Sequence, residues 1–212
     1  MAVQHEPRMD AGLRAQRRLR HQDLGRQQLL DAAEDVFGRK GFHDTTLREI
    51  AQQAEFSVGS VYSFFDSKDD LFLQIFVRRG GELLAEIEAV SSGAGTALDQ
   101  LHLLVDTEVG FFRRHPNFAR LMLRYANVPN LAAATPLHRR VGGDFERATT
   151  LQAEIFARGQ ATGELRDGDA EALSRIFSGL VLSFQTLDVS NDTTEWLPLD
   201  DFHEIVERAF AR

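Results

Sequence analysis

Small and hydroxyl side chains are concentrated in residues 57–65, which read SVGSVYSFF. Hydroxyl groups can bond phosphate oxygens or base edges, and small side chains let a helix enter the major groove of DNA closely. None of these residues can make the bidentate base contacts of Arg, Asn or Gln, so we expect sequence reading to depend on methyl contacts, arm residues and DNA shape. The residues that we expect to face the bases are Ser57, Val58, Gly59, Ser60, Ser63 and Phe64.

Residues 45–71 would position these side chains on two short helices joined by a tight turn, followed by the start of a third helix. Thr46 and Glu49 have the spacing of a capping box, and apolar residues then recur at three- and four-residue intervals. Ser57 is a good N-cap for the second helix, from which we expect Val58, Val61 and Phe65 to face inward. The pattern predicts a helix-turn-helix; the alternative is two helices that only pack in an all-helical core.

The order of residues in this stretch resembles the signature of the tetracycline-repressor (TetR) family. The shared positions are Thr46, Ile50-Ala51, Ala54, Ser57, Gly59, Tyr62, Phe65, Ser67-Lys68 and Leu71, and the match covers about residues 24–78. The resemblance implies that Tyr62 and Lys68 contact the DNA backbone. Thr46, at a helix N-terminus suited to anions, and Arg48 complete the expected DNA-binding residues.

Two residues depart from the family pattern. Glu55 stands where the turn usually has glycine, and Phe64 stands where a histidine usually precedes the closing phenylalanine. A non-glycine residue at positive φ costs about 1–2 kcal/mol. Glu55 therefore either carries this strain or marks a turn that is built differently, and Phe64 weakens any transfer of a specific contact to its position.

The net charge of −8 is confined to the second part of the chain. Residues 1–79 hold 12 basic and 12 acidic side chains, whereas residues 80–212 hold 12 basic and 20 acidic ones. Six arginines and two aspartates between residues 8 and 26 give a local excess of four positive charges, which suits DNA phosphates. We expect a flexible basic arm over residues 1–22, a DNA-binding domain over residues 23–78, and an effector-binding and dimerisation domain over residues 79–212.

Apolar residues at helical spacing continue through the second domain, and the sequence shows no convincing strand, so the expected fold class is all-α. The TetR resemblance implies an effector pocket in this domain. The few polar groups on apolar stripes would then be handles for an apolar or aromatic effector; the alternative is that they lie at stripe edges and reach solvent. The candidate effector-binding residues are His102, Leu104, Glu108, Phe111, Phe112, Met122, Tyr125, His138, Phe145 and Gln152.

The same resemblance implies a homodimer in which the last two helices of each subunit form a four-helix bundle. These helices correspond to about residues 169–188 and 199–211, and both carry strong apolar stripes. The alternative is that both stripes serve only the core of their own subunit. The candidate interface residues are Leu173, Ile176, Phe177, Leu180, Phe184, Phe202, Val206 and Phe210.

Several other classes of protein lack their sequence signatures. The chain has no cysteine, which excludes disulfides and thiolate zinc sites and suits the cytoplasm, and no apolar run approaches a membrane span. We find no catalytic motif, no metal site and no sign of a cofactor. The sequence therefore predicts a transcriptional regulator, most readily a repressor, with a palindromic DNA operator and a small-molecule effector. The alternatives are a helical small-molecule-binding protein or an enzyme, neither of which would bind DNA.

Overall fold

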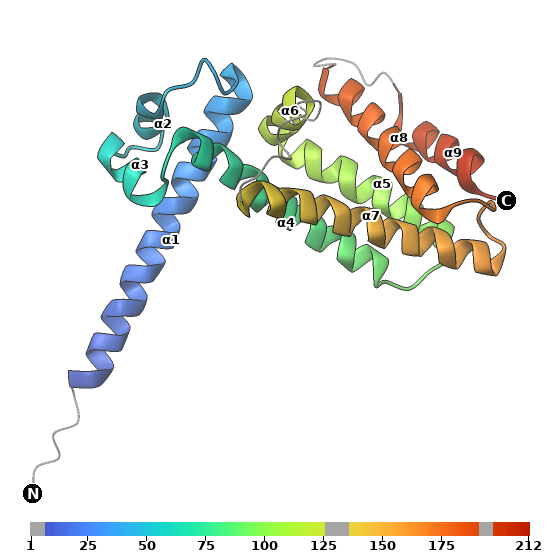
Figure 1. The fold of residues 1–212 in the computed structure, drawn as a ribbon, viewed down its shortest axis with the longest axis horizontal. Coiled ribbons are helices and arrows are strands. Elements are labelled where there is room, and N and C mark those ends of the chain that lie inside the picture. The colour runs from blue at the N-terminus through green and yellow to red at the C-terminus, as the bar shows by residue number, and fades with distance from the viewer. Residues whose placement is uncertain (1–6, 126–135, 191–196) are drawn as a thin grey trace, which may run out of the picture. The chain divides into compact units, whose positions relative to one another are not determined.

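The computed structural model describes residues 7–125, 136–190 and 197–212, with side chains placed from residue 14 on except at 15, 125, 136–141 and 190. Within these ranges the chain is built from helices, with one isolated antiparallel bridge between Leu165 and Ala211, so the expected all-α class is confirmed (Figure 1). The helices are α1 (Pro7–Lys40), α2 (Leu47–Gln53), α3 (Val58–Phe64), α4 (Lys68–Ser91), α5 (Ala97–Arg114), α6 (Pro116–Tyr125), α7 (Pro136–Thr162), α8 (Ala170–Ser190) and α9 (Leu199–Phe210).

The chain forms two compact units, residues 1–72 and 73–212. The division lies inside α4, so the first turn of this helix belongs to one unit and the rest to the other. The sequence placed the boundary after residue 78, which is also inside α4. A helix that crosses the boundary carries no break in hydrophobic pattern at that point, and so the sequence does not mark it.

The first helix begins earlier than the sequence indicated. We expected a flexible arm over residues 1–22, whereas α1 is continuous from Pro7 to Lys40, and residues 1–6 lie outside the described residues. Ala, Arg, Gln and Leu dominate its N-terminal part and all have high helix propensity. An apolar period is missing there because side chains such as Leu19, which is 60% exposed, have nothing to pack against.

In the first unit an aromatic cluster holds α1 against the start of α4. The ring of Phe37 lies 5.7 Å from that of Phe42 and 5.3 Å from that of Phe72, and Phe42 and Phe72 are 5.0 Å apart. Ile50 of α2 and Val61 of α3 are buried in the same unit. These contacts fix α2 and α3 on the side of α1 and leave one face of α3 uncovered.

The second unit has its own core, in which α5 packs against α6, α7, α8 and α9. Three phenylalanine rings from α7, α8 and α9 meet there, with Phe210 lying 5.1 Å from Phe156 and 6.0 Å from Phe177. Phe184 stacks on Phe202 at 4.5 Å. Five of the residues expected at a dimer interface are therefore buried in the core of their own subunit, namely Phe177, Phe184, Phe202, Val206 and Phe210.

This burial corrects the expected interface for those five residues. An apolar stripe repeats with the same period whether a helix packs on its own subunit or on a second copy. The spacing therefore could not distinguish the two packing partners.

Candidate nucleic-acid interface

The turn between α2 and α3 is a Schellman motif. The backbone N–H of Phe56 donates to the carbonyl of Ala51 at 2.8 Å, and that of Glu55 donates to Gln52 at 3.2 Å. Glu55 occupies the left-handed position of this motif, which glycine usually fills, with φ of 60°. It is the only non-glycine residue with positive φ in the described ranges. The turn thus keeps the geometry that the family pattern implies, although Glu55 stands in place of the usual glycine.

A capping box starts α2, as predicted. The N–H of Glu49 donates to the hydroxyl of Thr46 at 3.3 Å, and the N–H of Thr46 donates to the Glu49 carboxylate at 2.9 Å. Lys40 bonds the same carboxylate, and this bond, with the Thr46 bonds adding to it, lowers the pKa of Glu49 to about 2. The groups of Thr46 that we expected to bind an anion are therefore already occupied by a carboxylate, which a phosphate would have to displace.

Helix α3 presents a face of small and hydroxyl side chains. Ser57 caps the helix by accepting from the N–H of Ser60 at 3.0 Å, while Val61 and the following Phe65 are buried beneath it. A Cβ at Gly59 would meet only the Ser57 hydroxyl, at 3.7 Å, so no neighbour within the unit requires a glycine there. The exposed residues of this helix and its N-cap are Ser57, Val58, Gly59, Tyr62 and Ser63, with Ser60 half-buried.

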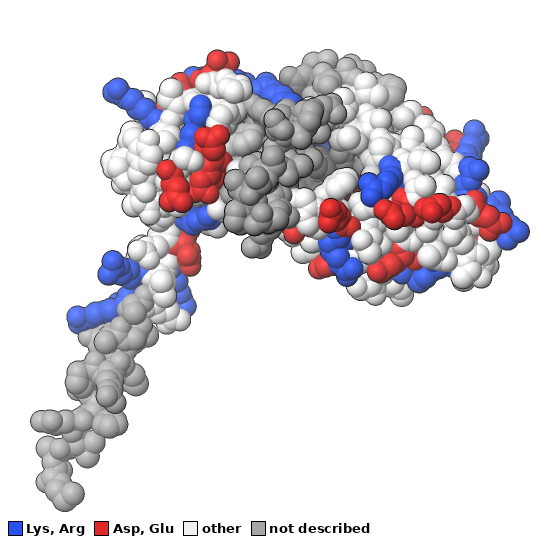
Figure 2. All heavy atoms as spheres, in the orientation of Figure 1, with Lys and Arg blue, Asp and Glu red and all other residues white. Residues whose placement is uncertain are grey.

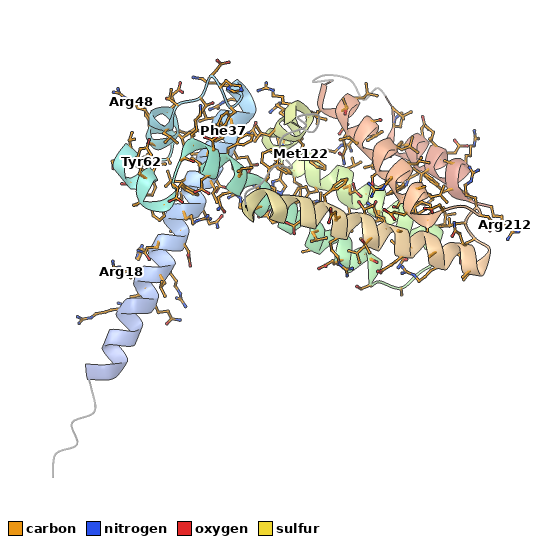
Figure 3. The ribbon with its side chains drawn as sticks, in the orientation of Figure 1. Arg18, Phe37, Arg48, Tyr62, Met122 and Arg212 are labelled. Carbon is orange, nitrogen blue, oxygen red and sulfur yellow. The ribbon has the colours of Figure 1, made fainter. Side chains whose placement is uncertain are left out.

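Tyr62 and Arg48 extend from this surface (Figure 3). Tyr62 is 58% exposed and Arg48 is also exposed, so both can reach a ligand outside the unit. Val58 is 37% exposed, which corrects its expected inward position and leaves it among the outward-facing residues. It occupies the first turn of α3, ahead of the point where the helix meets the core.

Phe64 lies differently from the other residues expected to face the bases. It is half-buried, and its ring packs edge-on against Phe56 at 6.3 Å. A Cβ at Gly25 of α1 would lie 3.3 Å from the Phe64 ring, so α1 approaches this ring closely. Phe64 therefore helps to set the position of α3 on α1.

Lys68, expected to contact DNA phosphate, makes its bonds within the first unit. Its ammonium donates to the carbonyl oxygens of Phe42 and Thr45 at 2.8 and 2.9 Å and lies 4.3 Å from the centre of the Phe42 ring. Two of its three N–H donors are thus used. Lys68 closes the loop between α1 and α2, and one donor remains for a phosphate.

In the second unit a polar chain crosses the core from α5 through α7 to α8. The amide of Gln152 donates to Glu108 at 3.0 Å, and its carbonyl accepts from the Ser178 hydroxyl at 2.6 Å. Glu108 and Gln152 are only 9% and 3% exposed. Burial raises the pKa of Glu108 to about 7, with the Gln152 bond opposing the shift.

The structure brings Glu108 and Gln152 together, both of which were candidates for effector binding. Ser178 was missed by the sequence, although a hydroxyl next to the stripe residues Phe177 and Val181 could have indicated it. The surroundings of this chain are apolar, since Leu104 and Phe111 are almost fully buried.

The other effector candidates do not gather at one place. Phe112 is buried and Met122 is half-buried, whereas Phe145 is 61% exposed and so cannot line an enclosed pocket as placed. His102 lies at the junction of α5 and α9, with its ring 4.9 Å from that of His203. The side chains of Tyr125 and His138 lie outside the described residues.

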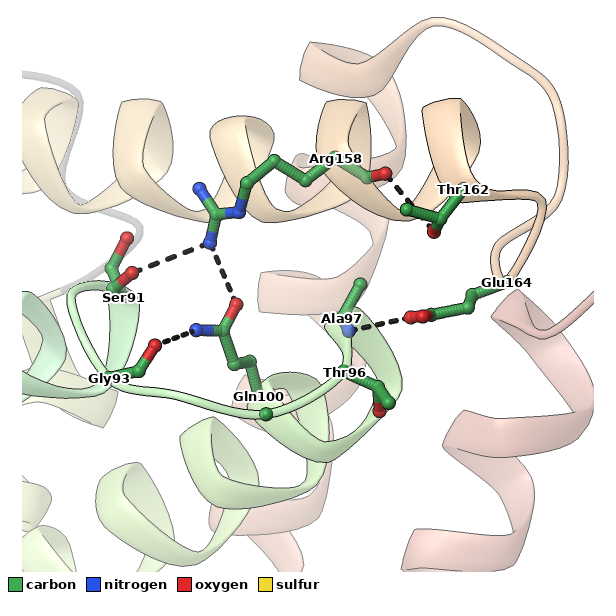
Figure 4. Close-up of a pocket in the computed structure, with 9 residues that line it drawn as sticks. Ser91, Gly93, Thr96, Ala97, Gln100, Arg158, Thr162 and Glu164 are labelled. Carbon is green, nitrogen blue, oxygen red and sulfur yellow. Dashed lines mark hydrogen bonds between the residues drawn. The ribbon is translucent and has the colours of Figure 1, made fainter.

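A surface pocket of about 210 Å³ lies beside the loop between α4 and α5 (Figure 4). Arg158 donates to Gln100 at 2.7 Å across it, and Glu164 accepts from the N–H of Ala97 at 2.7 Å. These bonds tie the loop to α7 and to the start of α5. None of the expected effector residues lines this pocket, and its polar lining does not suit an apolar effector.

The outer faces of α8 and α9 carry exposed aliphatic side chains. Ile176 is 55% and Leu187 is 38% exposed on one side of α8, and Ile205 of α9 is 43% exposed. Leu173 and Leu180, also expected at the dimer interface, are half-buried on the same side of α8. Three of the eight expected interface residues therefore remain available to a partner.

Two further features of the described residues concern metal ions and membranes. They contain no group of three or more His, Cys, Asp or Glu side chains arranged to hold a metal ion. No helix in the described ranges has the length and hydropathy to cross a bilayer.

The fold and the uncovered face of α3 together define a helical protein with a helix-turn-helix module at its N-terminus. Residues 29–75 match the sequence model of the family described as bacterial regulatory proteins, tetR family. The chain is also 30% identical to the nicotine-responsive transcriptional repressor HdnoR of Paenarthrobacter nicotinovorans, with 75% of this chain and 82% of that protein covered. The chain belongs to the TetR family of transcriptional regulators.

Solved structures share the whole fold at lower identity. FadR from Bacillus subtilis, determined in complex with stearoyl-CoA, is 21% identical with a TM-score of 0.70, and 86% of this chain and 95% of that chain are covered. The ketosteroid transcriptional regulator KstR2 of Mycobacterium tuberculosis is 18% identical with a TM-score of 0.72, covering 88% and 95% of the two chains. The relatives are transcriptional regulators, and the alternative of an enzyme is set aside.

Proposed function

We propose that this chain is a homodimeric transcriptional repressor that leaves its DNA operator when a small apolar or aromatic effector binds. The main support for DNA binding is the exposed face of α3. Its small and hydroxyl side chains stand on a helix that is capped at Ser57 and anchored by buried Val61 and Phe65. A helix fixed in this way can enter a major groove without rearrangement.

The contacts that this face offers fall into two kinds. Tyr62, with Arg48 on α2, extends far enough to bond phosphates, which would fix the position of the protein without reading sequence. Val58, Gly59 and the serines would approach the base edges. The Ser57 and Ser60 hydroxyls lie 2.8 Å apart and bond each other, so the hydroxyl that accepts this bond keeps its own O–H to donate to a base.

A second copy of the chain would cover the outer faces of α8 and α9. Ile176, Leu187 and Ile205 supply the exposed apolar side chains, and burying such residues is the main source of stability in obligate dimers. A dimer of this kind would present two copies of α3 to half-sites about 34–36 Å apart. The operator would then be a palindrome.

We place the effector beside Glu108 and Gln152. Their polar chain lies among buried apolar residues such as Leu104 and Phe111, which matches a ligand that is mostly apolar with one or two polar groups. The relatives are associated with different compounds: HdnoR with nicotine, FadR with stearoyl-CoA and KstR2 with ketosteroid. We therefore base the proposal of an apolar or aromatic effector on the residues of this chain and not on the relatives.

The experiment that tests this function starts with DNA selection. The full-length protein is incubated with random-sequence duplexes, bound duplexes are amplified over several rounds, and the result is located in the source genome. We expect a palindromic sequence upstream of a gene, bound in a saturable and salt-sensitive manner. Failure to enrich any sequence, at salt concentrations where the protein is folded, would refute the proposal.

A further inference from the structure

The buried stripe of α1 continues beyond the helix-turn-helix as a basic stripe. Leu29 and Ala32 of this stripe are buried in the first unit. Residues at three- and four-residue intervals share one helix face, and on this face Gly25 lies four residues before Leu29. Arg18 and Arg14 lie on this face as well, seven and eleven residues before Gly25 in the sequence. We call these two arginines the basic stripe.

Gly25 shows which way this face points. A Cβ added at Gly25 would lie 3.3 Å from the ring of Phe64 on α3 and 3.4 Å from the ring of Phe56. The face of α1 at this level is therefore directed at α3. Since α1 rises about 1.5 Å per residue, Arg18 and Arg14 lie roughly 10 and 16 Å from Gly25 toward the N-terminus, on the same side of the helix.

The basic stripe is exposed to solvent. Arg14, Arg18 and all residues from 16 to 24 are exposed. Figure 2 shows Lys and Arg side chains on this part of α1, and Figure 3 places Arg18 on it. The nearest acidic residues in the sequence are Asp10, four residues before Arg14, and Asp23, two residues before Gly25 and so close to the opposite face of the helix.

This segment lies outside the part of the chain that matches the family. The match to the family model begins at residue 29, after the basic stripe. Arg14 and Arg18 are therefore not among the residues on which that match depends.

We propose that the basic stripe binds the phosphates of duplex DNA that flanks the segment entered by α3. The proposal rests on the DNA-binding function proposed above. Phosphates follow each strand every 3.4 Å or so, and distances of 10 and 16 Å thus correspond to roughly three to five base pairs beyond α3. Duplex DNA fits better than an acidic protein because the stripe faces the same side as the exposed surface of α3 and carries the charge that phosphates require.

The test compares Arg18→Gln with Arg20→Gln in the full-length protein. Both variants lose one positive charge from an exposed position of α1, but Arg20 lies about 140° around the helix from Gly25. The probes are two forms of the duplex that the wild-type protein selects from random DNA. One covers only the selected bases, and the other is extended by about ten base pairs on each side, more than the three to five base pairs expected for the stripe.

On the extended duplex we expect Arg18→Gln to lower the slope of log affinity against log salt by about two units, because the proposed dimer carries two copies of Arg18. The double variant Arg14→Gln/Arg18→Gln should lower it by about four units, while Arg20→Gln should leave it close to wild type. On the short duplex all four proteins should bind alike. Circular dichroism of each variant checks that α1 remains helical.

Equal effects of Arg18→Gln and Arg20→Gln would overturn the proposal, because they would indicate a response to net charge alone. Unchanged salt slopes on the extended duplex would overturn it as well. A wild-type protein that selects no duplex would refute the proposed function and this proposal together. The two failures can thus be told apart.

Discussion

At the scale of single residues, Glu55 holds the most unusual backbone conformation in the described ranges, with φ of 60° at the left-handed position of the Schellman turn. Its side chain is exposed, so no packing compensates for the conformation. The strain of a residue with a Cβ at such a position is about 1–2 kcal/mol. Glycine lacks this strain but loses more chain entropy on folding.

We expect Glu55→Gly to stabilise the protein by up to about 1 kcal/mol, the difference between relieved strain and added entropy of the unfolded chain. Urea unfolding followed by circular dichroism measures this free energy. Glu55→Ala is the control, because alanine keeps the Cβ and should give a smaller change. A loss of stability in Glu55→Gly would show that the glutamate contributes an interaction that outweighs the strain.

The raised pKa of Glu108 makes the stability of the second unit depend on pH. In the unfolded chain this carboxyl has its ordinary pKa of 4.5, whereas burial raises the pKa to about 7 in the folded protein. The folded state therefore binds the proton more tightly. The stability that this provides is fully present below pH 4.5 and is lost as pH rises to about 7, by an amount on the order of 3 kcal/mol.

Glu108→Gln should remove this dependence. Glutamine has the same shape, stays neutral at every pH and can still accept the bond from Gln152. We expect the variant to be more stable than wild type above pH 7 and to differ little near pH 4. Thermal unfolding at several pH values measures the difference, and parallel curves for the two proteins would contradict the assigned pKa.

Lys68 and Tyr62 were both expected to contact phosphate, but the structure separates their roles. Lys68→Ala removes charge-assisted bonds to two carbonyl oxygens, and we expect a loss of roughly 1–3 kcal/mol in stability together with weaker DNA binding. Tyr62→Phe should leave stability within about 0.5 kcal/mol of wild type, because this side chain is exposed. It should weaken binding to all duplexes alike. A change in sequence preference in Tyr62→Phe would contradict a phosphate contact.

At the scale of helices, the sequence predicted those features that local residues determine. The caps at Thr46 and Ser57 both follow from side chains within one turn of the helix start. The N-terminal half of α1 was missed because its helical state comes from propensity alone. The contact of Gln152 with both Glu108 and Ser178 was missed because a stripe does not say which helices it will meet.

The exposed side of α8 gives a sharper test of dimerisation than the buried stripes do. A charge at Phe184 or Phe210 would unfold the subunit, since both are buried in its core. Ile176→Asp instead changes a side chain that is 55% exposed, and we expect a folded monomer that binds the operator weakly. Leu103→Asp is the control, because Leu103 is 49% exposed on α5. Sedimentation velocity measures the state of each variant, and a dimeric Ile176→Asp protein would place the interface elsewhere.

At the scale of the whole molecule, the two units share α4, whose first turn belongs to the first unit and whose remainder belongs to the second. Lys68 at its start bonds the loop before α2, so a tilt of α4 would pull directly on the helix-turn-helix. An effector in the second unit could act on DNA binding through this helix. Coupling of this kind amounts to about 1–3 kcal/mol, or a 5–150-fold change in operator affinity.

The last prediction concerns this coupling, with Glu108 as the polar contact for the effector. Phe111→Ala is a poor test, because the side chain is 1% exposed and its removal would cost about 3–5 kcal/mol of stability. Glu108→Gln keeps the shape of the core, so its operator affinity at pH 7 should stay within about twofold of wild type. A compound that releases the wild-type protein from the operator should release the variant at least about fivefold less effectively. Operator affinity measured with and without a compound found by screening for release gives both numbers. By thermodynamic reciprocity, the operator must weaken binding of that compound to the wild-type protein by the same factor. A folded, dimeric Glu108→Gln protein that is released as readily as wild type would show that the effector binds away from Glu108.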